Sequence, residues 1–502
     1  MKVATTWHER TVTRWRSNVL VLALLGVGML VWPAGAGAAG QARVPQPGPL
    51  NPAFVEAMHE PLAGVFGKVP NPVKVQLGRV AEARAARLAL PPAYDLRQQG
   101  RLTPVRNQGG LGTCWAFANL AAVESSLMPG KSWDFSEDNL VTRSGYGPFR
   151  GGPYLWGGWD FMAVAYLTRW AGPVNETADP YNTPTPPKTN GALTHVQGVV
   201  MLPGRTGFLD NDLIKQLVMQ NGALSVGMFW TSAFYSSDSS ADATATATYY
   251  CNVAAGETFN GYEVGENHGV DIVGWDDSYP ASRFTGSTAG APPGDGAFLA
   301  RNSWGAGWGD HGYFWVSYYD RSFAFDDMTS YSRVDPTSDY SRNYQYDKLG
   351  WTSSLGYTDV PDPSVAWAAN RFTARGKQPI VAEGFYAPAA GTKYQVWAGA
   401  TLGSLTLSGS GTIALPGFAT IDLTTPLKVR PGKTFAVAVR LDTPGDAQPI
   451  AIEAPAETWE AHAAASTGQS FMRYGDKDRW VDLAGDPSTA HTNVCLKAYA
   501  GK

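Results

Sequence analysis

The chain has 502 residues, of which 44% are hydrophobic and 16% charged, and its formal net charge is −4. This apolar content excludes a largely disordered chain, and the near balance of charge gives no electrostatic basis for binding nucleic acid or an anionic membrane surface. The length predicts more than one domain, and the 56 glycines and 35 prolines predict many turns.

An export signal is predicted at residues 1–38. Arg10, Arg14 and Arg16 precede an apolar run at residues 19–32, which small residues follow. The run is shorter than the ~20 residues that a spanning helix needs, so a cleaved signal is favoured over an uncleaved anchor. We therefore expect a secreted, periplasmic or cell-surface protein. Residues 39–89, rich in Ala, Pro and Val, are expected to form a short pro-segment or N-terminal extension.

Residues 90–332 carry mixed helix and strand patterns. Apolar spacing predicts helices at residues 114–127 and 163–170, and Ser136 followed by Glu137 is typical of a helix N-terminus. Strands are predicted at residues 223–229, 269–275, 297–302 and 312–318. Residues 236–248 and 282–296 have low complexity and are expected to be surface loops.

Residues 333–345 are polar and tyrosine-rich, and we interpret them as a linker. From residue 346 onward, β-rich runs at 394–398, 419–423, 434–440 and 493–499 are separated by Gly/Pro turns. This pattern is typical of an all-β sandwich. The predicted fold class is therefore α+β, with a mixed domain at residues 90–332 and a sandwich at 346–502.

The densest chemical signal surrounds Cys114, the first residue of a predicted helix. A helix N-terminus favours the thiolate form, because free N–H groups and the helix dipole stabilise negative charge there. Gln108, six residues earlier, is placed to supply an amide N–H beside the thiol, with the Cys114 N–H as second donor to an oxyanion.

Two further motifs supply a base and its orienting group. His268 opens an apolar strand, where an imidazole near a thiol acts first as base and then as acid. Asn302 begins the run Asn-Ser-Trp-Gly, and its amide oxygen suits the imidazole N–H. Trp304 would cover that hydrogen bond.

Together the Gln…Cys-Trp-Ala-Phe, Asn-His-Gly and Asn-Ser-Trp-Gly runs resemble the papain family of cysteine peptidases. The resemblance covers about residues 90–319 and implies a two-lobed catalytic domain, one lobe helical and one β-barrel-like. It implies that Cys114 is the nucleophile, His268 the base, Asn302 the orienting residue and Gln108 the oxyanion donor.

The resemblance also implies a substrate-binding surface. Gly151 and Gly152 would form the backbone edge that pairs with an extended peptide, with a plain turn as the equal alternative. Tyr154, Leu224 and Gly269 would line the pocket for the second residue on the acyl side of the scissile bond, which predicts an apolar or aromatic preference.

The chain departs from the family at several positions. Two disulfide half-cystines of the family are replaced by Leu111 and Phe149, and a third family cysteine by Arg143. We expect apolar contact in place of the first bridge. Asn267 stands where plant members often carry Asp, which removes a negative charge beside the base. No long helical pro-domain is recognisable in residues 39–89.

The remaining cysteines are Cys251 and Cys495. A disulfide between them would join the two domains, but we expect free thiols because Cys495 lies in a predicted strand. Asp271, Asp276 and Asp277 lack the spacing of a metal site and are expected to form a solvated turn.

The sequence thus predicts a cysteine endopeptidase that acts on protein or peptide substrates as a monomer, without metal or cofactor. One alternative is a cell-wall peptide amidase or transpeptidase using the same residues. Another is a catalytically idle adhesin that acts through the C-terminal domain. That domain resembles lectin-like sandwiches found behind papain-type peptidases, which implies glycan or cell-surface binding, with a pure packing role as the alternative.

Overall fold

The computed structural model describes residues 43–59, 67–77, 89–146, 154–155, 157–182, 191–237, 247–455 and 463–502. The predicted signal at residues 1–38 lies outside these ranges. In the described part of the chain, no helix combines the length and apolarity that crossing a membrane would require.

Helices gather in the first half of the chain. The α-helices are α1 (Pro52–His59), α3 (Cys114–Leu127), α4 (Glu137–Arg143), α5 (Asp160–Thr168) and α6 (Asp212–Asn221), and single 3₁₀ turns are η1 (Ser232–Phe234), η2 (Ala281–Arg283) and η3 (Leu483–Gly485).

Strands make up most of the remaining structure. Before residue 337 they are β1 (Gln46–Pro47), β2 (Ala93–Asp95), β3 (Thr194–Leu202), β4 (Leu224–Met228), β5 (Tyr235–Ser237), β6 (Ala247–Tyr249), β7 (Thr258–Phe259), β8 (Tyr262–Glu263), β9 (His268–Asp276), β10 (Ala297–Arg301), β11 (Tyr313–Ser317) and β12 (Met328–Pro336). After it they are β13 (Arg342–Tyr344), β14 (Ser353–Gly356), β15 (Val365–Thr373), β16 (Ile380–Ala387), β17 (Thr392–Gly399), β18 (Thr406–Ile413), β19 (Gly417–Leu427), β20 (Thr434–Asp442), β21 (Ile450–Glu453), β22 (Ser470–Arg473), β23 (Val481–Asp482), β24 (Asn493–Val494) and β25 (Leu496–Ala500).

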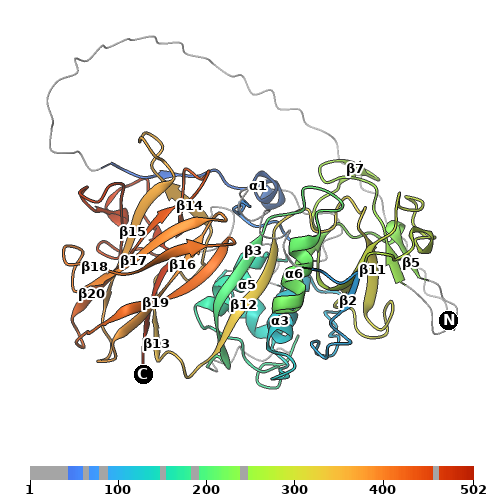
Figure 1. Ribbon diagram of the computed structural model, residues 1–502, viewed down its shortest axis with the longest axis horizontal. Helices are drawn as coiled ribbons and strands as arrows, with labels where there is room; N and C mark the ends of the chain where they lie inside the picture. The colour runs from blue at the N-terminus through green and yellow to red at the C-terminus, as the bar shows by residue number, and fades with distance from the viewer. Residues whose placement is uncertain are drawn as a thin grey trace, which may run out of the picture. The chain divides into compact units, whose positions relative to one another are not determined.

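Helix α3 lies at the centre of the first core. Nearly all of its residues are buried, and apolar residues on every side of a helix are typical of a core position. Helices α3, α4 and α5 form one lobe, and α3 packs on β9 and β12 of the other (Figure 1). Ser136 caps α4, because its Oγ accepts the Asn139 N–H at 3.0 Å, as the sequence predicted.

The second lobe is a sheet in which β3, β12, β4, β9, β10, β11, β6 and β5 are neighbours in that order. This sheet continues into the C-terminal half, because β19 pairs antiparallel with β3 (Figure 1). Beyond β19 it includes β16, β25 and β13. One continuous hydrogen-bonded sheet therefore joins both halves of the chain.

The C-terminal half is a β-sandwich, as predicted. A six-stranded sheet, β18-β17-β20-β15-β22-β23, packs over a core shared with β16 and β25. The core is formed by inward-facing side chains such as Phe385, Val437 and Leu496. A smaller sheet places β1, from the N-terminal extension, against β14.

Several predicted boundaries move. Helix α3 has the predicted bounds. Helix α5 begins three residues earlier and ends two residues earlier than the helix predicted at residues 163–170. Strand β3 and helix α6 were not predicted. The predicted linker at residues 333–345 contains the end of β12 and all of β13, because these segments pair with β3 and β25. Tertiary pairing thus orders a polar stretch that composition alone suggests is irregular.

The junction between β19 and β3 depends on Gly417. Its φ is +139°, and an added Cβ would lie 2.0 Å from the Val199 carbonyl oxygen. Gly417→Ala is expected to lower the free energy of unfolding by backbone strain plus a steric clash, each about 1–3 kcal/mol.

The matched control is Gly432→Ala. Gly432 has φ +75° but an added Cβ would meet nothing within 4 Å, so only the strain remains. Chemical denaturation of both variants measures the difference, which should be about 1–3 kcal/mol. Equal losses would mean that the close approach at Gly417 does not matter.

Candidate active site

Cys114 is the first residue of α3 and is fully buried. Its Sγ accepts a hydrogen bond from the Gly269 N–H at 3.2 Å. An added Cβ at position 269 would lie 3.5 Å from the Cys114 and Trp115 backbone, which is ordinary van der Waals contact, so this approach of strand β9 does not depend on glycine. The contact places the thiol at the first residues of β9, next to His268.

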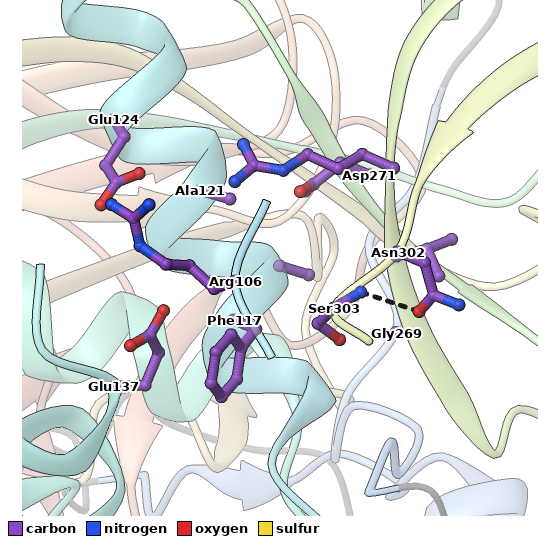
Figure 2. Close-up of a pocket in the computed structure, with 12 residues that line it drawn as sticks. Arg106, Phe117, Ala121, Glu124, Glu137, Gly269, Asp271, Asn302 and Ser303 are labelled. Carbon is purple, nitrogen blue, oxygen red and sulfur yellow. Dashed lines mark hydrogen bonds between the residues drawn. The ribbon is translucent and has the colours of Figure 1, made fainter. Parts of the chain in front are cut away.

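His268 is held in one tautomer by Asn302. The Nε2 of His268 lies 2.9 Å from the Oδ1 of Asn302, which follows β10. The same Oδ1 accepts the Ser303 N–H at 2.8 Å, which identifies this atom as the oxygen of the amide (Figure 2). Nε2 therefore carries the hydrogen, and in the neutral ring Nδ1 has the basic lone pair.

Gln108 is anchored to the loop that carries Asn302. Its backbone N–H donates to the Ser303 carbonyl at 2.8 Å, and its Oε1 accepts the Ser303 hydroxyl at 2.5 Å. One N–H of its amide donates to the Leu111 carbonyl at 2.7 Å. These bonds hold the amide of Gln108 near the N-terminus of α3.

Trp304 covers the imidazole. Its ring stacks on His268 with centroids 4.8 Å apart and an interplanar angle of 25°. Trp230 in turn packs edge-on against Trp304 at 4.9 Å. Asn267 fixes the position of Trp230, since its side chain accepts the Trp230 N–H and donates to the Trp230 carbonyl. The His268–Asn302 bond is thus screened from water by aromatic rings.

A polar cavity lies behind the site, between α3 and the strands β9 and β10. Figure 2 shows Arg106, Glu124, Glu137 and Asp271 around it, with Asn302 at its edge. Burial raises the pKa of each of these three carboxyl groups. The cavity therefore belongs to the interface of the two lobes that aligns β9 and β10 with α3.

Residues 67–69 of the N-terminal extension lie directly on the site. The Lys68 N–H donates to the Asn267 carbonyl at 3.2 Å, and the Val69 N–H to the Gly158 carbonyl at 3.0 Å. The Gly158 N–H donates to the Gly67 carbonyl at 2.9 Å, which makes a parallel bridge between Lys68 and Gly158. This extended segment occupies the backbone groups that flank Cys114 and His268.

Glycines make the approach of this segment possible. An added Cβ on Gly67 would lie 2.2 Å from the Gly112 backbone, and one on Gly157 would lie 2.5 Å from the Gly67 carbonyl. Both residues have positive φ, which favours glycine.

The enclosed site keeps its reactive groups neutral. Burial raises the pKa of the Cys114 thiol to about 12, against the smaller opposing effects of the Gly269 N–H and Lys68. Burial also lowers the pKa of His268 to about 4, although the hydrogen bond to Asn302 raises it. With the segment in place, neither a thiolate nor an imidazolium is favoured at neutral pH.

The other predicted site residues are placed as follows. Gly151 and Gly152 lie outside the described residues. Tyr154 donates its hydroxyl to Asp138 and accepts the Gly112 N–H at its carbonyl. Leu224 is fully buried in the core of the second lobe, three residues before Gly227, which pairs with Gly269.

Sequence reasoning missed Gly158, Asp160 and Lys68. The Gly157-Gly158 pair lies closer to the helix predicted at residues 163–170 than the Gly151-Gly152 pair does. This shorter distance was the signal that could have distinguished the two pairs. Lys68 and Asp160 are far apart in sequence, so no local pattern could connect them.

All three cysteines are free thiols, which confirms the expectation for Cys251 and Cys495. Phe149, at a position of the missing family bridge, lies outside the described residues. The predicted replacement of that bridge by apolar contact therefore stays a prediction.

Comparison with known proteins agrees with the geometry. A family model described as papain family cysteine protease matches residues 90–332. Residues 90–332 belong to the papain family of cysteine peptidases. A second model, described as lectin like domain, matches residues 343–500, so the chain is a cysteine-type peptidase with a C-terminal lectin-like domain.

Curated relatives match the peptidase domain. A "Cysteine protease" of Blomia tropicalis is 29% identical over 253 residues, which are 49% of this chain and 67% of the relative. Cathepsin S of Mus musculus is 31% identical over 234 residues, 45% of this chain and 58% of the relative. This chain thus spans little more than half the length of cathepsin S.

Two solved structures match both domains. The cysteine protease and lectin-like domains of Cwp84, a surface layer associated protein of Clostridium difficile, superpose with a TM-score of 0.74 at 24% identity, covering 92% of this chain and 99% of that one. Clostridial Cwp84 after propeptide cleavage gives 0.68 at 25% identity, covering 82% and 99%. The two-domain fold is therefore shared with these proteins.

The neutral state of Cys114 predicts a shift in reactivity. When residues 39–89 are cleaved off, the thiol loses much of its burial and its pKa should fall, because burial is the main cause of its rise. We expect the pH at half-maximal alkylation of Cys114 to fall by more than about one unit, measured by iodoacetamide labelling and peptide mapping.

Cys251 is the internal control for this measurement. Burial raises its pKa to about 12 as well, but it lies in the core, so cleavage should leave its labelling unchanged. Identical profiles for Cys114 before and after cleavage would show that residues 67–69 do not enclose the thiol.

Proposed function

We propose that this protein is a cysteine endopeptidase in which Cys114 attacks the peptide carbonyl with His268 as its acid–base partner. The observation that carries the proposal is the contact of the Cys114 thiol with the first residues of β9, where His268 is fixed by Asn302. Nucleophile, base and orienting group are then supplied by three separate elements, as covalent catalysis requires.

The acylation step follows from the tautomer. Nε2 donates to Asn302, so the Nδ1 lone pair takes the proton of the Cys114 thiol. The thiolate sulfur bonds to the peptide carbonyl carbon, and His268 returns its proton to the amine nitrogen as the C–N bond breaks. A thioester on Cys114 and a free amine are the products of this step.

The oxyanion and the deacylation use the same groups. The Cys114 N–H and the Gln108 amide stabilise the negative oxygen of the tetrahedral intermediate. Water, deprotonated by His268, then attacks the thioester carbon and releases the acid with the Cys114 thiol restored. These steps need no metal or cofactor.

Residues 67–69 must leave the site before a substrate can enter it. Their backbone bonds to Gly158 and Asn267 use the groups that an extended peptide would use. We therefore assign residues 39–89 the role of a pro-segment. Export through the signal at residues 1–38 accords with the surface layer association of Cwp84.

The sequence is compatible with two alternatives to this function. A cell-wall amidase or transpeptidase would use the same residues and differ only in substrate. An idle adhesin would not need Asn302 to hold His268, or Ser303 to hold Gln108, next to the Cys114 thiol. The geometry favours a working enzyme.

Glycan or cell-surface binding by the lectin-like domain stays a prediction. Trp351 and Trp367 are buried, and the Arg473 guanidinium lies between the rings of Trp367 and Trp480 at 4.4 and 4.5 Å. These rings are used for packing, so they give no support for sugar stacking. We propose that the enzyme works as a monomer on protein or peptide substrates.

The function is tested with the cleaved protein, an epoxide-type thiol inhibitor and a panel of peptides. We expect one adduct on Cys114 and hydrolysis of peptides, both lost in Cys114→Ala. Cys251→Ala is the matched control and should retain both, because Cys251 lies in the core away from the site. An adduct elsewhere, or no hydrolysis, would contradict the proposal; cleavage of cell-wall peptides alone would favour the amidase.

A second prediction concerns the oxyanion. Gln108→Ala removes one donor and should reduce kcat by about 10²–10³-fold, while KM changes little, because the bond forms only in the transition state. Steady-state kinetics on one peptide measure both constants. A rise in KM at constant kcat would instead assign Gln108 to substrate binding.

A further inference from the structure

The side chain of Lys68 occupies a buried pocket beside the nucleophile. Its Nζ lies 2.6 Å from the Oδ1 of Asp160, and the exposed fractions of the two side chains are 1% and 0%. Asp160 opens α5, two residues after Gly158 and directly after Trp159. A fully buried lysine needs a fixed countercharge, because burial strongly disfavours an unpaired ammonium.

A second carboxyl group faces the same pocket. Glu266, two residues before His268, is buried, and its Oε1 has no hydrogen-bond partner among the described residues. Its carboxylate is seated on Gly227, where an added Cβ would lie 1.9 Å from Oε1. Burial lowers the pKa of Lys68, but Asp160 and Glu266 outweigh that effect, so its pKa is raised and it stays charged.

Charge is divided between the pocket and its occupant. Asp160, Glu266, Asp326 and Asp327 all belong to the peptidase domain. Burial, and then the neighbouring carboxylates, raise the pKa of the Glu266 and Asp327 carboxyl groups. The lysines that offset them, Lys68 and Lys74, both belong to residues 67–77. Once those residues leave, the described part of the pocket retains its acids and loses both cations.

The position of Lys68 ties this pocket to substrate recognition. Lys68 is the residue that bridges Gly158, and its N–H is bonded to the residue that precedes His268. If a substrate strand pairs with Gly158, the side chain of the residue opposite Gly158 would point into the same pocket. This holds for a parallel and for an antiparallel strand.

We propose that this pocket selects a basic residue, lysine or arginine, at the second position on the acyl side of the scissile bond. The inference rests on the proposed peptidase function and names its substrate class. A cation restores the partner of the buried Asp160, whereas an apolar side chain leaves that carboxylate unpaired and is rejected. The apolar preference expected from Tyr154, Leu224 and Gly269 is thereby replaced by a basic one.

The test compares peptides that differ only at that second position, using the cleaved wild-type protein. Lysine is matched with norleucine, which has a similar chain length and no charge, and both are compared with leucine. We expect kcat/KM for the lysine peptide to exceed that for norleucine by at least about tenfold, because the two differ in one desolvated charge pair. Epoxide titration of Cys114 gives the concentration of active sites.

Variants connect the preference to the pocket. Asp160→Asn and Glu266→Gln should each reduce the lysine-to-norleucine ratio, with the larger loss at Asp160, which contacts Lys68 directly. Asp160 also accepts a hydrogen bond from Asn119 at 2.7 Å, so Glu266→Gln provides a second, independent variant if Asp160→Asn does not fold. Glu263→Gln, on the exposed strand β8, is the matched control and should keep the wild-type ratio.

The outcomes separate the two claims. Hydrolysis of all peptides with a ratio near one, or with leucine preferred, would overturn the basic preference and leave the peptidase function standing. A lysine preference that survives in both variants would overturn the assignment to this pocket. Absence of hydrolysis together with absence of a Cys114 adduct would overturn the peptidase function itself.

Discussion

The close approach of helix α3 to strand β9 is the constraint on which the site depends. The Gly269 N–H donates to the Cys114 sulfur at 3.2 Å, and this bond places the preceding residue, His268, beside the thiol. Strand β10 pairs with β9 and brings Asn302 to the imidazole. Loss of the contact between α3 and β9 would separate the nucleophile from its base without altering either side chain.

The same close packing leaves Cys114 and His268 buried in this state. Residues 67–69 bond to Asn267 and Gly158 beside the site, and burial favours the neutral form of Cys114 and of His268. Lys68 is held by one backbone hydrogen bond to Asn267 and by its ion pair with Asp160. One segment thus blocks the peptide-binding backbone, desolvates the thiol and fills the side-chain pocket.

The sequence predicts structure that depends on neighbouring residues better than structure that depends on contacts between residues far apart in the chain. Helix α3 has the predicted bounds because its apolar residues and Cys114 form one local pattern, and the strands of the sandwich alternate clearly. Strand β3, the order in residues 333–345 and the Lys68–Asp160 pair depend on contacts between residues far apart in the chain. The peptide-pairing edge was predicted at Gly151 and Gly152, and the second pair six residues later, Gly157-Gly158, was missed.

The most direct measurement is a crystal structure of the cleaved protein bound covalently to a peptidyl epoxide. The epoxide carries lysine at the position that corresponds to the second residue on the acyl side of the scissile bond. We expect a thioether on the Cys114 sulfur, backbone bonds of the inhibitor to Gly158, and the lysine ammonium against Asp160 where Lys68 lies now. A bond to Cys251 or Cys495 would contradict the catalytic assignment. A lysine side chain directed to solvent would contradict the basic pocket.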